Sequence, residues 1–167
     1  MIKIIYIVSI IGVIIDQISK FIIDKVLKLN DSIDVMDTFF NITYIRNTGA
    51  AWGIFSNGTI VLALVSILFL IFLLKYINEN KKDLTKLTSI SLGLLIGGLI
   101  GNLIDRVIRG YVIDFFDFKI FTYDFPVFNI ADILIVVAVI LLIIEGFIGD
   151  DKNDSRRRKE KNRPVSK

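Results

Sequence analysis

The chain has 167 residues, of which 54% are hydrophobic, and its formal net charge is +3. This length and apolar content favour a small bundle of membrane helices over a soluble domain. The sequence contains neither cysteine nor histidine, which excludes a Cys or His nucleophile and the common zinc sites. Any chemistry must therefore use Asp, Glu, Lys, Arg, Asn, Ser or backbone groups.

Four stretches are long and apolar enough to cross a bilayer. The hydrocarbon core is about 30 Å thick and a helix rises about 1.5 Å per residue, so a span needs about 20 residues. Asp16 and Lys20 interrupt the end of the first stretch, and no small-x-small cleavage pattern follows it, so we expect a retained helix rather than a signal peptide. The predicted spans are residues 2–23, 59–77, 88–104 and 131–148.

Small residues recur every four positions in the third span, at Ser89, Gly93, Gly97 and Gly101. Residues at this spacing lie on one helix face, where a neighbouring backbone can approach closely. We interpret the stripe as a packing surface.

Positive charge predicts the orientation, because Lys and Arg are retained on the cytoplasmic side of the membrane. Lys3, the connection between the second and third spans, and the C-terminal tail together hold 13 of the 20 Lys and Arg residues. Both termini are therefore expected in the cytoplasm, with residues 24–58 and 105–130 outside.

Basic residues crowd the end of the chain, after the last span. We expect residues 1–149 to form the membrane domain and residues 150–167 a disordered cytoplasmic tail. Such a tail acts as a topology signal and contacts anionic membrane lipids. A charge run confined to a tail does not indicate nucleic-acid binding by the whole protein.

Aromatic residues gather in the two outer segments, which favours positions in the headgroup layer. In the first segment Phe40, Ile42 and Tyr44 alternate with polar residues, a pattern that predicts one or two short strands. The second segment, residues 111–128, is expected to be an aromatic-rich interfacial loop. The fold class is therefore an α-helical integral membrane protein with a small extracytoplasmic β element.

Polar residues from separate segments reach one depth near the outer surface. Asp16 and Lys20 lie one turn apart on the first helix, and ionisable groups inside a membrane are costly enough to need a role. The other members of this group are Asn47, Asn102, Asp105, Arg106, Asp114 and Asp132.

Each of these residues has a structural explanation beside a functional one. Lys20 can pair with Asp16 as an anchor, and the spacing of Asn129 and Asp132 is that of a helix capping box. Two close carboxylates, in contrast, share one proton and supply the acid and base of an aspartic protease. Asp132, near a helix N-terminus, is then the favoured base. A small transporter and a noncatalytic scaffold are the competing hypotheses.

Five motifs resemble those of the lipoprotein signal peptidase (signal peptidase II) family. They occur in one order and extend from the first predicted helix to the fourth. Their residues are Asp16-Gln17-Ile18-Ser19-Lys20, Asn47-Thr48-Gly49-Ala50-Ala51-Trp52-Gly53, Gly101-Asn102-Leu103-Ile104-Asp105-Arg106, Val112-Ile113-Asp114-Phe115 and Phe128-Asn129-Ile130-Ala131-Asp132.

The resemblance implies an aspartic endopeptidase in which Asp114 and Asp132 are catalytic. It implies that the site lies near the outer face and uses neither a metal nor an organic cofactor. It also implies a location in the bacterial cytoplasmic membrane, and we expect the chain to be a monomer. The substrate would be a diacylglyceryl-modified prolipoprotein, cut on the amino side of the lipidated cysteine. Trp52 stands where the family pattern has Phe, which concerns substrate fit. The residues expected to line or support the site are Asn47, Asn102, Arg106, Asp16, Lys20 and Asn129.

Overall fold

Each apolar stretch forms one long helix in the computed structural model, which describes residues 1–49, 58–120 and 123–161. Every helix contains a window that can cross a membrane, which in the last helix is Ile130–Phe147. The predicted spans are confirmed, and all four helices run further because polar end residues continue the helical backbone. The last helix continues to Lys161, into the segment that was expected to be a disordered tail. The helices are α1 (Ile2–Val26), α2 (Thr59–Asn80), α3 (Lys86–Arg109) and α4 (Ile130–Lys161).

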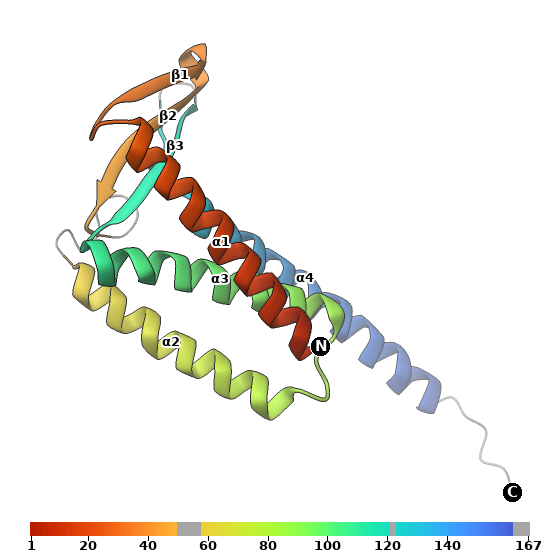
Figure 1. Cartoon of the computed structure of the whole chain (residues 1–167). Helices are drawn as coiled ribbons and strands as arrows, with labels where there is room; N and C mark the ends of the chain where they lie inside the picture. The colour runs from red at the N-terminus through yellow and green to blue at the C-terminus, as the bar shows by residue number, and fades with distance from the viewer. Residues whose placement is uncertain (50–57, 121–122, 162–167) are drawn as a thin grey trace, which may run out of the picture.

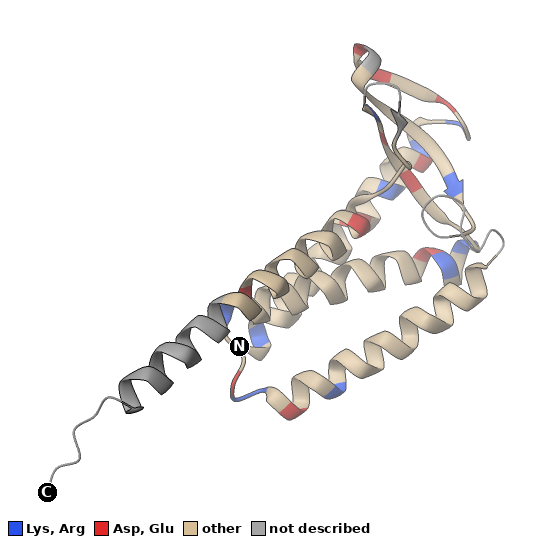
Figure 2. Ribbon diagram, turned by 180° about the vertical axis from the view of Figure 1, so that it is seen from behind, with Lys and Arg blue, Asp and Glu red and all other residues tan. Residues whose placement is uncertain are grey.

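Helix α3 is the centre of the bundle and packs against α1, α2 and α4 (Figure 1). In its most apolar window 56% of the residues are buried, against at most 22% in the other three helices. Because lipid tails are as apolar as leucine, membrane helices pack through small and polar residues and turn large apolar side chains outward. The charged residues gather toward the two ends of the bundle (Figure 2).

A small antiparallel sheet stands at the end of the bundle opposite the N-terminus (Figure 1). The prediction of one or two short strands in the first outer segment is confirmed: two are present, and they are joined by the short helix η1 (Asp37–Phe39). Ile23 of α1 packs beneath the sheet against Tyr44, Ile113 and Phe115. In spatial order the described strands are β1 (Ser32–Met36), β2 (Phe40–Asn47), β3 (Val112–Ile120) and β4 (Tyr123–Asp124).

The second outer segment differs from the expected loop, because most of it is strand. β3 pairs along β2, with Phe40 opposite Phe118 and Asn47 opposite Val112. Its β-branched and aromatic residues suit a strand, but its partner comes from a segment far away in the sequence. Asp114 and Asn47, expected in loops, therefore both lie in strands.

The small-residue stripe is a packing surface, as predicted. A Cβ at Gly93 would lie 2.7 Å from Val8 Cβ, and one at Gly101 would lie 2.5 Å from Asp16 Oδ2. The stripe thus faces α1 at van der Waals contact. Gly98, outside the stripe, faces α4 instead, where a Cβ would overlap the carbonyl oxygen of Ala131.

Gly98→Ala is expected to destabilise the protein, because the added methyl group meets backbone that must move. Overpacking of this kind lowers the free energy of unfolding by about 1–3 kcal/mol. Gly146→Ala is the matched control, since a Cβ there meets nothing within 4 Å. A helical Gly→Ala change in open space is worth about 0.5–1 kcal/mol in favour of the helix. Thermal unfolding in detergent checks both, and equal midpoints for the two variants would contradict the close approach of α3 and α4.

Candidate active site

The sheet register brings Asn47 and Asp114 together. Asp114 lies opposite Ile45, and Asn47 lies opposite Val112, so the two polar residues are diagonal neighbours on one face of the strand pair. Asn47 Nδ2 donates a hydrogen bond of 2.8 Å to Asp114 Oδ2. The Asp114 side chain is buried, at 2% exposure.

Asn129 connects the two carboxylates. Backbone hydrogen bonds between Phe128 and β3 place the start of α4 beside Asp114. In one of them Phe128 N donates to Phe116 O at 3.2 Å. Asn129 Nδ2 then donates to Asp114 Oδ1 at 2.6 Å. Asn129 N also donates to Asp132 Oδ2 at 3.1 Å, and Asp132 N donates to Asn129 Oδ1 at 3.1 Å. The predicted capping box is therefore present, and it holds Asp132 on the residue that also binds Asp114.

Asn102 of α3 holds the other oxygen of Asp132. Its Nδ2 donates to Asp132 Oδ1 at 2.8 Å. Its Oδ1 accepts from Lys20 Nζ at 2.9 Å and from Asn129 Nδ2 at 3.1 Å. Because a lysine ammonium can only donate, this contact fixes which end of the Asn102 amide faces Asp132.

Lys20 is fully buried between two acids. Its Nζ lies 2.9 Å from Asp16 Oδ2 and 3.1 Å from Asp105 Oδ2, and all three side chains are at 0% exposure. The predicted Asp16–Lys20 pair is confirmed. Asp16 Oδ1 also accepts from Ala131 N at 3.0 Å, so the cluster ties α1 and α3 to the start of α4.

Asp105 and Gln17 were not among the predicted site residues, although both lie in the motifs. Gln17 Nε2 donates to Asp16 Oδ2 at 3.1 Å and to the carbonyl of Gly101 at 3.1 Å. The available signal was helical spacing, since Asp105 follows Asn102 by three residues and so shares its face.

A cavity of about 600 Å³ opens between α2, α3, α4 and the sheet. Five of the predicted residues line it, whereas Asp16, Lys20 and Asn129 lie behind its wall. Apolar residues such as Leu99, Ile133 and Val136 form its sides on the helices. Arg106 Nη1 lies 3.5 Å from the carbonyl of Asn102. The polar lining residues are Asn47, Asn102, Arg106, Asp114 and Asp132.

Two expectations from the sequence, on the role of Trp52 and on cofactors, stay predictions. Trp52 and the rest of residues 50–57 lie outside the described part of the chain. Within residues 1–49, 58–120 and 123–161, no group of three acidic side chains is placed to hold a metal ion. The expectation that no cofactor is needed stays a prediction.

The environment of Asp114 favours its protonated form. Burial, and after it the negative charge of Asp132, raise the pKa of this carboxyl group to about 7. The hydrogen bonds from Asn47 and Asn129 act in the opposite direction. A carboxyl group with this pKa carries a proton about half of the time near neutral pH, which suits a general acid beside a second carboxylate.

Lys20→Met is expected to destabilise the protein strongly, because it leaves two buried carboxylates without their cation. Removing one partner of a buried ion pair costs about 3–5 kcal/mol. Lys25→Met is the control on the same helix, since Lys25 is exposed. Thermal unfolding of the purified proteins checks this, and a midpoint for Lys20→Met equal to that of Lys25→Met would show that the cluster does not hold the helices together.

Comparison with known proteins agrees with this architecture. The family model for signal peptidase (SPase) II matches residues 8–148. A bacterial membrane enzyme solved by the in meso method at 2.3 Å is 39% identical with a TM-score of 0.79, over 96% of this chain and 93% of that one. Another, solved by the same method at 1.9 Å, is 42% identical with a TM-score of 0.74, over 83% of this chain and 89% of that one. The chain therefore belongs to the signal peptidase II family of aspartic peptidases, which remove signal peptides from lipoproteins.

Proposed function

We propose that Asp114 and Asp132 are the catalytic pair of this peptidase. They cleave a diacylglyceryl-modified prolipoprotein on the amino side of its lipidated cysteine. The observation that carries the proposal is the placement of both carboxylates on the wall of one cavity, each hydrogen-bonded to Asn129. Asn129 thereby fixes the position of the acid relative to the base.

The reaction follows from the different surroundings of the two groups. Asp132, in the first turn of α4, is stabilised as an anion by the helix N-terminus and takes a proton from a water molecule. The water oxygen bonds to the scissile carbonyl carbon, while protonated Asp114 gives its proton to the carbonyl oxygen. The C–N bond then breaks, the cysteine amine leaves with the proton held by Asp132, and the hydroxyl proton returns to Asp114.

The cavity suits a substrate that is part peptide and part lipid. Its polar lining comes from β2, β3 and the adjoining ends of α3 and α4, and its apolar sides continue along α3 and α4. A lipid-anchored precursor reaches this depth by lateral diffusion, which lowers the entropic part of the barrier. Phe125 and Phe128 line the same cavity, with ring centroids 5.8 Å apart, and they clamp the peptide in this proposal.

We further infer the orientation and assembly of the protein. The excess of Lys and Arg at the N-terminus, the α2–α3 connection and the tail supports a cytoplasmic position for both termini. The sheet and the site, at the opposite end of the bundle, then face the outer side of the bacterial cytoplasmic membrane. A monomer suffices, because one chain supplies all of the named site residues, and the basic tail contacts anionic lipid.

Asp114→Asn and Asp132→Asn are each expected to abolish cleavage, because an amide can neither accept nor deliver the required proton. Each purified variant is incubated with a diacylglyceryl-modified precursor, and the released signal peptide is measured. Asp34→Asn, an exposed acid on β1, should cleave like the unmodified protein. Cleavage retained in either site variant would overturn the two-carboxylate assignment. Ion flux without cleavage would support a transporter instead.

The pH profile tests the role of Asp114 as the acid. The value of kcat/KM should fall as pH rises through about 7, because the protonated form of Asp114 is lost over that range. Asn47→Ala removes a hydrogen bond that lowers this pKa, so the alkaline limb should move to higher pH. Asn41→Ala, elsewhere on β2, should leave the limb in place. A limb that stays fixed or moves to lower pH in Asn47→Ala would contradict the assignment of the acid.

A further inference from the structure

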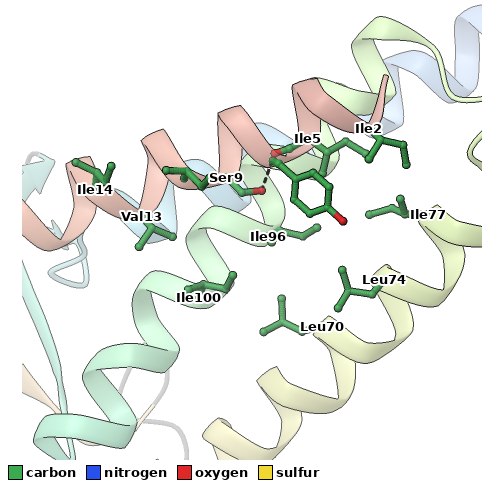
Figure 3. A pocket seen from close by; sticks show the side chains of 12 residues that line it. Ile2, Ile5, Ser9, Val13, Ile14, Leu70, Leu74, Ile77, Ile96 and Ile100 are labelled. Carbon is green, nitrogen blue, oxygen red and sulfur yellow. Dashed lines mark hydrogen bonds between the residues drawn. The ribbon is translucent and has the colours of Figure 1, made fainter.

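Another cavity, of about 420 Å³, lies between α1, α2 and α3 (Figure 3). Apolar side chains from the three helices converge on it, including Val13, Leu70 and Ile96. The hydroxyl of Ser9 is already used, because it donates to Ile5 O at 2.8 Å and to Gly93 O at 3.0 Å. An apolar cavity of this kind stays dry, so its natural content is hydrocarbon. No lining residue is shared with the catalytic cavity.

The length of this groove matches one leaflet of the bilayer. Its lining on α1 extends from Ile2 to Ile14. At about 1.5 Å per residue this is about 18 Å, close to half of the roughly 30 Å hydrocarbon core. The groove therefore accommodates an acyl chain that enters from the leaflet around the N-terminal end of α1 and ends near the bilayer centre.

Positive charge continues the lining at the end where the headgroup would lie. On α1, Lys3 precedes Tyr6 and Ile10 by three and seven residues, which places all three on one helix face. Leu74 and Ile77 of α2 precede Lys81, the C-cap of that helix, by seven and four residues, which again places the three residues on one face. Both lysines are exposed, and neither forms an ion pair with any residue that the structure describes.

We propose that this groove is a binding site for one anionic phospholipid. One acyl chain lies along the groove, and the phosphate lies between Lys3 and Lys81. The charge complementarity of these two ammonium groups selects an anionic headgroup over a zwitterionic one. The bound chain braces α2, which supplies Ser66 to the wall of the catalytic cavity.

A photoreactive phosphatidylglycerol tests the headgroup contact. The full chain is placed in phosphatidylcholine vesicles with a small fraction of a phosphatidylglycerol that carries a diazirine on its acyl chain. Crosslinks are expected on the peptides that contain Tyr6 and Leu74. Lys3→Gln combined with Lys81→Gln should weaken this labelling about 30-fold, at roughly fivefold per lysine near the membrane surface.

The control for charge is Lys75→Gln. Lys75 lies one residue from Leu74 and therefore off the groove face, and its Nζ is 4.0 Å from Glu79. This variant should label like the unmodified protein. Equal labelling by a phosphatidylcholine probe of the same acyl structure would overturn the selection for an anionic lipid.

Plugging the groove separates this site from other basic surfaces, including the tail. Ile10→Trp and Leu74→Trp each place a large ring in the groove without changing any charge, and both positions are at least 50% exposed, so the fold should tolerate them. Each should abolish the groove crosslinks, whereas Ile18→Trp, on α1 beyond the lining, should not. Unchanged labelling in both plugged variants would overturn the proposal, as would crosslinks between two copies of the chain through this face.

Discussion

A buried ammonium group is the constraint on which the rest of the structure depends. Lys20 uses its three N–H groups on Asp16, Asp105 and Asn102, all within 3.1 Å. An unpaired charge at this depth is costly in a membrane, so each partner has to stay in place once the helices have assembled. Because Asp16 also accepts a hydrogen bond from the backbone of α4, the same cluster fixes three helices at the end where the sheet begins.

The side-chain amides of Asn102 and Asn129 connect this cluster to the carboxylate pair by hydrogen bonds. Lys20 orients the Asn102 amide, which presents its NH₂ group to Asp132, and Asn129 binds both Asp132 and Asp114. The two acids thereby share one partner residue, Asn129, but lie in different surroundings. Asp132 stands in the first turn of a helix, whereas Asp114 is buried in a strand where its pKa rises to about 7. A difference of this kind assigns the base and the acid in the proposed reaction.

The sequence by itself determined the features that depend on local pattern. Apolar windows of about 20 residues predict the four spans, because the thickness of the bilayer sets the length of a helix. Small residues every four positions predicted the face of α3 that meets α1, and alternation predicted the strands of the first outer segment. The spacing of Asn129 and Asp132 predicted the capping box, and the motifs indicated the family. In each case the signal lies within one segment of the sequence, so it does not depend on which partner that segment meets.

Only the tertiary structure decided the contacts between distant segments. The strand character of residues around Asp114 depends on pairing with β2, which is about 70 residues earlier, and the contact with Asn47 follows from that register. The place of Asp105 in the lysine cluster depends on the approach of α1 to α3 through glycines. The proton affinity of Asp114 depends on burial and on its distance from another charge. These are properties of assembled surfaces, because desolvation and Coulomb interactions arise only when separate elements meet.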